Sequence, residues 1–255
     1  MHPVIFGFLK SYGLTLSLSF LLGILLCLRR GRARGMSDDM VMDFCFAVLV
    51  SSLVGVRLLF VLTHSGEFHP WYRAFYIWEG GLTLYGGIVL ATATVWWLAR
   101  RRGIPFLPMA DVMSPSVALG IGITRIGCFL NGCCFGLPTR LPWGVTFPEG
   151  SLPARILGHV PLHPSQLYGS LGGFGVCGLL LLWERRRAPV GATFARFLLL
   201  YGLVRYVEDY ARWYEQGARL AGGLTVNQGI SLALAAAGGA LLVGLARRKG
   251  PAGVA

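Results

Sequence analysis

Long apolar runs separated by short polar stretches dominate the chain. A helix that crosses a bilayer needs about 20 mostly apolar residues, and seven runs come close to that length. The pattern therefore predicts an all-α, polytopic membrane protein with seven transmembrane helices. The predicted helices are Tyr12 to Leu28, Met40 to Leu62, Gly80 to Leu98, Val112 to Leu130, Pro164 to Trp183, Gly191 to Tyr210 and Val226 to Ala246.

Basic residues gather at the ends of these runs and indicate the orientation. Of the 23 Lys and Arg residues, 13 lie in four clusters: 29–34, 100–102, 185–187 and 247–249. Each cluster follows an odd-numbered run, and cytoplasmic loops are the loops enriched in Lys and Arg. The N-terminus is thus predicted outside and the C-terminus in the cytoplasm.

Composition narrows the class of protein further. Hydrophobic residues make up 55% of the 255 positions and charged residues 13%, a balance too apolar for an ordinary soluble domain. The net charge of +12 lies in short clusters at helix ends, so it does not indicate a nucleic-acid partner. We expect a single membrane domain over 1–255, with an outer loop of about 131–163 as part of the site. The N-terminus lacks the basic start and cleavage site of a removed signal peptide.

Three arginines lie where charge is costly. Arg57, Arg125 and Arg205 each fall in the outer half of a predicted helix, and a charge in hydrocarbon costs about 2.5 to 3.5 kcal/mol on insertion scales. Guanidinium groups bind phosphate with paired hydrogen bonds, and lipid headgroups offer phosphate at that depth. For any one arginine the alternative is internal pairing, as between Arg205 and Glu208 or Asp209. For three at one depth, an anion site is the better interpretation.

Other polar residues share this depth: Tyr12, Tyr85, His163, Gln166 and Tyr168. Glycine pairs at 80–81 and 86–87 flank Tyr85, and glycine lets backbone approach a ligand or another helix closely. The outer ends of the helices are therefore the predicted site.

The motifs that carry these residues resemble those of the bacterial prolipoprotein diacylglyceryl transferases. The resemblance rests on Trp78 to Gly87, Arg125 to Gly136, His163 to Tyr168, Tyr201 to Arg205, and Arg212. It implies transfer of a diacylglyceryl group from phosphatidylglycerol to the lipobox cysteine of a prolipoprotein. The products would be a thioether and glycerol phosphate, and the location would be the bacterial inner membrane. The resemblance implies no cofactor.

The resemblance also implies roles for individual residues. Arg125 and Arg205 match essential arginines that would stabilise the departing phosphate, and Arg57 matches a third. Tyr85 stands where a thiol-activating histidine is found in the best-studied members, and Gly169 stands where an acidic residue is common. The positions implied in substrate binding are Arg57, Tyr12, Asn131, Gly136, Gln166, Tyr168, Asp209 and Arg212.

Cys128, Cys133 and Cys134 cluster at the outer end of the fourth predicted helix. With His163 they could bind a metal, but their spacing fits no standard zinc pattern, so no metal is predicted. A disulfide and a catalytic thiol remain open. His163 itself is either a polar group at a helix start or a general base for the acceptor thiol.

Two alternatives to the transferase stay open. A paralogue could move a glycerolipid to another acceptor, as Tyr85 and the cysteines would allow. A lipid-binding or transport protein could keep the fold without the chemistry, since intramembrane arginines also serve anion pathways. Polar residues concentrate in the outer half rather than along the full depth of the helices, which favours the transferase.

Overall fold

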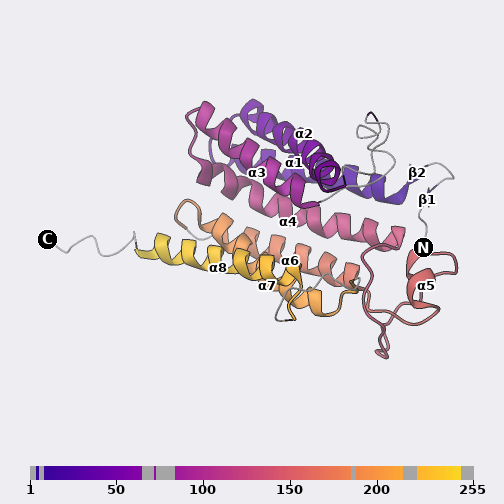
Figure 1. Ribbon diagram of the computed structural model, residues 1–255. Coiled ribbons are helices and arrows are strands. Elements are labelled where there is room, and N and C mark those ends of the chain that lie inside the picture. Colours follow the sequence, from indigo (N-terminus) through magenta and orange to yellow (C-terminus); the bar gives the residue numbers. More distant parts are fainter. Residues whose placement is uncertain are drawn as a thin grey trace. The chain divides into compact units, whose positions relative to one another are not determined.

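A computed structural model describes residues 4–5, 9–64, 72, 84–184, 188–214 and 223–247. The described chain forms eight helices and one ribbon of two short strands, β1 (Val4–Ile5) and β2 (Leu9–Lys10) (Figure 1). The chain divides into two compact units. One unit comprises 1–27 with 110–255, and the other comprises 28–109.

The helices agree closely with the seven predicted runs. Every run contains a helix, and the described ends differ from the predicted ends by six residues or fewer, the largest difference being the start of α4. The start predicted at Gly80 lies outside the described residues. The helices are α1 (Ser11–Arg32), α2 (Asp38–Thr63), α3 (Leu84–Arg101), α4 (Phe106–Asn131), α5 (Leu152–Leu157), α6 (Ser165–Glu184), α7 (Ala192–Tyr210) and α8 (Val226–Arg247).

Five of these helices are long and apolar enough to cross a membrane: α1, α2, α4, α6 and α8. The other two predicted spans are less apolar for identifiable reasons. Helix α3 ends in Arg100 and Arg101, and α7 contains Arg196, Arg205, Glu208 and Asp209. The described residues thus form a mainly helical chain with five candidate spans.

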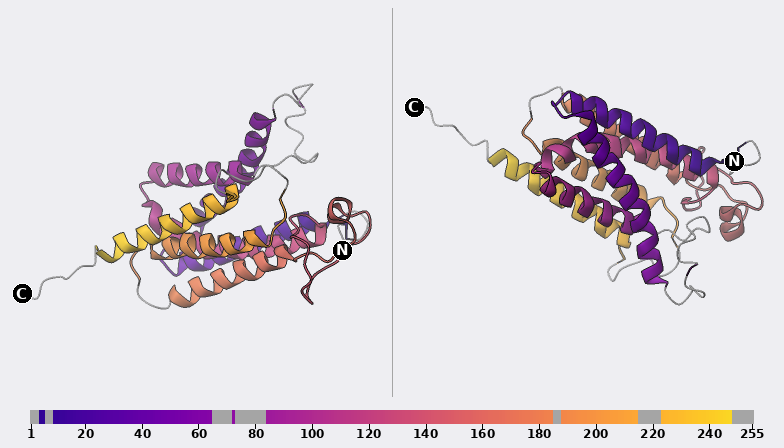
Figure 2. Two further views of the ribbon diagram at one scale, coloured as in Figure 1. Left: turned by 60° about the horizontal axis from the view of Figure 1, so that its bottom comes forward. Right: turned by 90° about the horizontal axis from the view of Figure 1, so that it is seen from above.

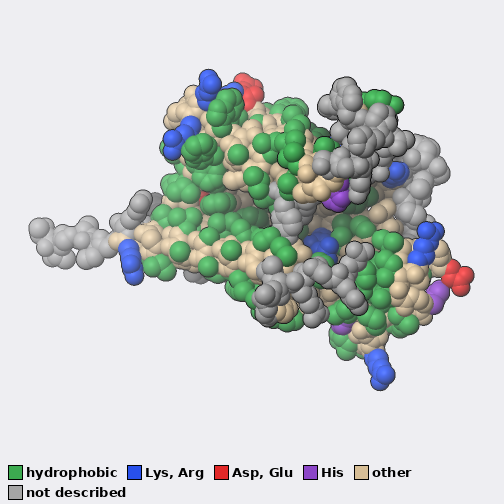
Figure 3. Space-filling model, in the orientation of Figure 1, with side chains coloured by type: hydrophobic (Ala, Val, Ile, Leu, Met, Phe, Trp, Pro, Cys, Tyr) green, Lys and Arg blue, Asp and Glu red, His purple; other side chains and the backbone are tan. Residues whose placement is uncertain are grey.

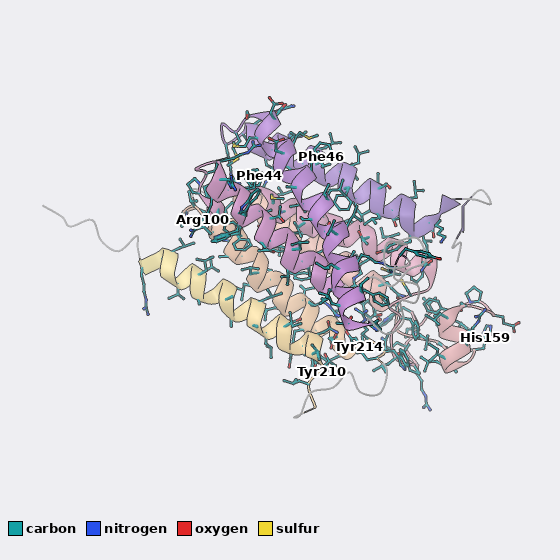
Figure 4. The ribbon with its side chains drawn as sticks, turned by 45° about the horizontal axis from the view of Figure 1, so that its top comes forward. Phe44, Phe46, Arg100, His159, Tyr210 and Tyr214 are labelled. Atoms are coloured by element: carbon teal, nitrogen blue, oxygen red, sulfur yellow. The ribbon has the colours of Figure 1, made fainter. Side chains whose placement is uncertain are left out.

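The surfaces of these helices are rich in apolar side chains, as expected for contact with lipid. Leu171 on α6 is 71% exposed and Val207 on α7 is 68% exposed. Figure 3 shows hydrophobic side chains over much of the visible surface of the helices. On α2, Phe44 is buried whereas Phe46, two residues on, is exposed (Figure 4).

The unit of residues 28–109 is built on a hairpin of α2 and α3. Ser37 caps α2 by accepting a hydrogen bond from the backbone N–H of Met40. Gly55 and Gly86 pack backbone to backbone, and a Cβ on either would overlap the other's carbonyl. At the other end of the hairpin, Arg102 pairs with Asp43 at 2.6 Å. The close crossing explains Gly86, which the sequence showed only as part of a glycine pair.

In the larger unit, α6, α7 and α8 lie side by side (Figures 1 and 2). Val176, Leu180 and Phe197 form a buried core with Ala118 of α4. A Cβ on Gly202 would lie 2.6 Å from the Ser231 carbonyl, so glycine permits the close crossing of α7 and α8. Asp111 accepts hydrogen bonds of 2.7 Å from the backbone N–H groups of Gly191 and Phe194 and so caps the start of α7.

The loop between α4 and α6 is ordered by its own small core. Phe135, Phe147 and Leu162 are buried together, and Leu162 exchanges two backbone hydrogen bonds with Val145. Proline-rich sequence gave no sign of the six-residue helix α5, which Ser151 caps. The result is a rigid segment packed at one end of α4 and α6.

Candidate active site

A buried cluster of charges lies where α4 and α7 meet. Arg205 on α7 pairs through Nη1 with Asp209 at 3.2 Å and with Glu208 at 3.6 Å. Glu208 also faces Arg125 of α4, with 3.5 Å between Oε1 and Nη2. The side chains of all four are at most 14% exposed. Arg205 therefore does pair on its own helix, and the same carboxylates bring Arg125 beside it.

Residues that follow α7 complete the surroundings of Asp209. Tyr214 lies beyond the end of α7 (Figure 4) and accepts a hydrogen bond of 2.8 Å from Arg205 Nη2. The hydroxyls of Tyr214 and Thr225 both donate to Asp209. Thr225 and Gln228 bond reciprocally in a capping box at the start of α8. Asp209 thus ties the end of α7 to the start of α8.

Guanidinium groups outnumber carboxylates in this part of the unit. Arg212 joins Arg125 and Arg205, so three guanidiniums stand against the two carboxylates of Glu208 and Asp209. The Nε of Arg212 is buried and has no hydrogen-bond partner. Buried donors are normally satisfied. An anion with several acceptor oxygens would satisfy both the excess charge and the free donor.

The loop after α4 carries three thiols against this charge. The sulfur atoms of Cys128, Cys133 and Cys134 lie within 4.8 Å of one another. Hydrogen bonds from the other two thiols, with the charges of Arg212 and Arg125, hold the pKa of Cys134 well below its usual range. The loop thus lies near Arg212 and near Arg125, which Glu208 of α7 also faces.

Ser165 and Gln166 hold this loop rather than simply capping α6. Ser165 Oγ donates to the carbonyl of Cys134, and Gln166 Nε2 donates to the carbonyl of Cys133, both at 2.8 Å. Gln166 is fully buried, and its Oε1 has no hydrogen-bond partner. Its observed contacts position the loop, while its free oxygen could still meet a ligand.

His163 and Tyr168 are joined at the start of α6. The ring Nδ1 of His163 lies 3.2 Å from the Tyr168 hydroxyl, which also accepts a hydrogen bond of 2.8 Å from Trp143 Nε1. Gly136 lies between two backbone segments, because a Cβ there would lie about 2.5 Å from the carbonyls of His163 and Ala211. The predicted residues Gly136, His163 and Tyr168 therefore meet at the loop.

The other predicted site residues lie on α1, α2, α3 and α4. Tyr12 lies in the first turn of α1 beside Gly127, and a Cβ on Gly127 would lie 3.5 Å from the Tyr12 Cα. Asn131 ends α4 and is exposed. Arg57 is buried on α2, with its guanidinium 5.7 Å from the Phe60 ring centroid. Arg57 and Tyr85 belong to the unit of residues 28–109, so their part in the site stays a prediction.

Comparison with known proteins identifies the family. The sequence matches the prolipoprotein diacylglyceryl transferase family over residues 3–244. The chain belongs to this family. It is 34% identical over 247 residues to a phosphatidylglycerol–prolipoprotein diacylglyceryl transferase of Geobacter sulfurreducens, covering 94% of this chain and 92% of the relative. The transferase of Bordetella avium is 34% identical, with 93% and 90% covered, and transferase 2 of Streptomyces coelicolor is 35% identical, with 88% and 72% covered.

Gly169 of α6 lies against the charges of α4 and α7. A Cβ on Gly169 would lie 3.0 Å from Glu208 Oε1 and 3.1 Å from Arg125 Nε. Glu208, reaching across from α7, therefore occupies the space beside Arg125 that a longer side chain at 169 would need.

Several contacts of this family member were not predicted from its sequence. Trp143, Tyr214 and Thr225 reach their partners from separate loops, and no local pattern marks them. Glu208 did carry a signal, since its spacing of three from Arg205 places both on one helix face. That signal predicted the pairing with Arg205 but not the contact with Arg125.

Proposed function

We propose that this protein transfers a diacylglyceryl group from phosphatidylglycerol to the lipobox cysteine of a prolipoprotein. The observation that carries the proposal is the buried excess of guanidinium over carboxylate at Arg125, Arg205 and Arg212. The proposed substrates are those in the names of the Geobacter sulfurreducens and Bordetella avium relatives. Exposed apolar helix surfaces suit a lipid substrate that enters from the bilayer.

The chemistry needs positive charge that is already in place. The acceptor thiol loses its proton, and its sulfur forms a bond to the glycerol carbon that carries the phosphate. The C–O bond to phosphate breaks, and glycerol phosphate leaves with the bonding electrons. Negative charge on the phosphate is thereby increased, and fixed guanidiniums stabilise that charge more in the transition state than in the ground state.

The carboxylates of α7 prepare the arginines for this task. Asp209 and Glu208 hold Arg205 in place through 3.2 and 3.6 Å contacts. Among the described residues Arg125 forms an ion pair with Glu208 at 3.5 Å, which is longer than a good charge-assisted hydrogen bond. Arg125 therefore has donors to spare for phosphate, while Arg205 is the more rigid support.

The remaining predicted residues receive proposed roles around this centre. Tyr12, Asn131 and Arg57 would contact the lipid, and Tyr168 and Arg212 would line its headgroup. Gly136 and Gln166 would hold the loop, and Asp209 would orient Arg205. Tyr85 takes the position of the family's histidine and is proposed to shape the acceptor side of the site.

The transfer reaction itself tests the function. Purified protein in phosphatidylglycerol micelles is incubated with a lipobox peptide, and mass spectrometry measures the thioether product and glycerol phosphate. Formation of both supports the proposal. Lipid consumption without modification of the peptide would favour the paralogue with another acceptor, whereas anion flux in vesicles without any transfer would favour a transport protein.

We further propose one membrane domain in the bacterial inner membrane, with all seven long helices spanning it and the N-terminus outside. The five apolar helices and the basic residues at the ends of α1, α3 and α8 support this arrangement. An alkaline phosphatase reporter inserted at Arg140 in the outer loop should be active, and one fused after Ala255 should be inactive. Activity at the C-terminal fusion would contradict the orientation.

We propose His163 as the base for the acceptor thiol, with Nδ1 engaged by Tyr168 and Nε2 turned to the sulfur. His163→Gln should lower transfer about 10²-fold near neutral pH. The loss should shrink above about pH 8.5, where a free thiol ionises unaided. Rates measured from pH 6 to pH 9 check this expectation, with exposed His159→Gln as the matched control. An equal loss at every pH would show that His163 only positions the loop.

A further inference from the structure

The three thiols at the end of α4 form a compact group of soft ligands. We propose that Cys128, Cys133 and Cys134 bind a thiophilic d¹⁰ metal ion, Zn²⁺ or Cu⁺, that fastens the loop to α4. The sequence spacing did not predict a metal, because the fold and not the spacing brings these sulfurs together. The proposal is independent of the transfer reaction.

The distances between the sulfurs suit one ion. All three sulfur atoms lie within 4.8 Å of one another. Sulfurs bound tetrahedrally to one Zn²⁺ at about 2.3 Å lie about 3.8 Å apart, so side-chain rotations would bring the three sulfurs together around an ion. Thiolate sulfur selects Zn²⁺ and Cu⁺ over Mg²⁺ and Ca²⁺. A disulfide uses only two sulfurs and would leave the third thiol without a role.

The loop that carries the ligands is already held in place. The backbone N–H of Cys133 donates to the Cys128 carbonyl at 3.1 Å. Ser165 and Gln166 donate hydrogen bonds of 2.8 Å to the carbonyls of Cys134 and Cys133, respectively. Cys128 is itself buried on α4, with 7% of its surface exposed. An ion bound here would meet ligands whose backbone needs no rearrangement.

The backbone of Cys134 is unusual. Its φ of 59° lies in the left-handed region. Among the residues that the structure describes, Cys134 is the only non-glycine residue with a positive φ. Such a conformation is costly for a residue with a Cβ and persists where the surroundings enforce it. With this backbone conformation, the sulfur of Cys134 lies beside the sulfurs of Cys128 and Cys133. A metal site would require this placement.

The charge around the cluster is also suitable. Three thiolates with Zn²⁺ carry a net charge of −1, and with Cu⁺ a net charge of −2. Arg125 and Arg212 act electrostatically on Cys134, and their positive charge would offset this excess. Buried charges are usually compensated by such partners.

Metal content of the full chain tests the site. Protein purified in detergent under reducing conditions is loaded with Zn²⁺ or Cu⁺, passed over a desalting column, and measured by inductively coupled plasma mass spectrometry. We expect about one ion per chain, and less than a tenth of that in Cys128→Ser, Cys133→Ser or Cys134→Ser. Cys27→Ser, Cys45→Ser and Cys177→Ser, whose cysteines lie outside the cluster, should keep the full content.

A measurement on the wild type alone guards against variants that fail to fold. Bound Zn²⁺ or Cu⁺ should slow alkylation of Cys133 and Cys134 by iodoacetamide at least tenfold, as mapped by peptide mass spectrometry. Uptake well below one ion per chain, equal uptake by the three variants, or unchanged alkylation would each overturn the proposal. Transfer activity in metal-free protein would leave the proposed function intact and show the ion to be structural.

Discussion

Arg125→Gln should lower the rate of diacylglyceryl transfer by about 10²–10³-fold, the usual cost of removing one donor that stabilises charge in a transition state. Glutamine keeps a polar side chain of moderate length but loses the charge and the guanidinium fork. The residual rate would come from Arg205 and Arg212. Product formation by mass spectrometry at saturating phosphatidylglycerol gives the comparison with wild type.

A lower transfer rate of Arg125→Gln can be distinguished from a loss of folding. Arg125 contacts Glu208 at 3.5 Å, so its removal leaves Glu208 still facing Arg205. We therefore expect Arg125→Gln to elute as the wild type does in gel filtration. Arg125→Lys restores a point charge without the fork and should recover part of the rate. Arg155→Gln, in the exposed part of the loop, is the matched control, and a rate for Arg125→Gln within threefold of it would contradict the role of Arg125.

The helices were predictable because their apolar runs are long. The predicted span Val226 to Ala246 differs from α8 by one residue at its end, and Gly191 to Tyr210 differs from α7 by one at its start. Helix α5 was missed because six residues with a proline carry no periodic signal.

The site was predictable only in part, for a physical reason. Arg125 and Arg205 stood out because charge in an apolar run is costly, and that cost is local to the sequence. Their partners were harder to find, since Tyr214 and Thr225 come from turns after α7 and before α8. Likewise the contact of Glu208 with Arg125 depends on the close approach that Gly169 allows. Contacts of this kind follow from packing and not from a pattern.

Asp209→Asn should destabilise the protein more than any other single change to the carboxylates, because Asp209 accepts two hydrogen bonds and pairs with Arg205. Its side chain is 3.2 Å from Arg205 Nη1 and accepts the hydroxyls of Tyr214 and Thr225. An amide neutralises the charge and turns one acceptor into a donor that faces a hydroxyl or a guanidinium. Breaking a buried pair by changing one partner costs about 3–5 kcal/mol, and the change should appear as a lower thermal midpoint in detergent.

The fully exposed position of Glu149 offers the matched control, since its side chain is 90% exposed. Glu149→Gln removes the same charge and should leave the midpoint unchanged. A second test removes both partners in the double variant Arg205→Met with Asp209→Leu. The double variant should be more stable than Asp209→Asn, because neither charge of the pair is left buried without its partner. It should also lose transfer activity. A midpoint for Asp209→Asn equal to that of Glu149→Gln would show that Asp209 does not hold α7 to α8. It would also remove the reason for treating Arg205 as the rigid support beside a more freely available Arg125.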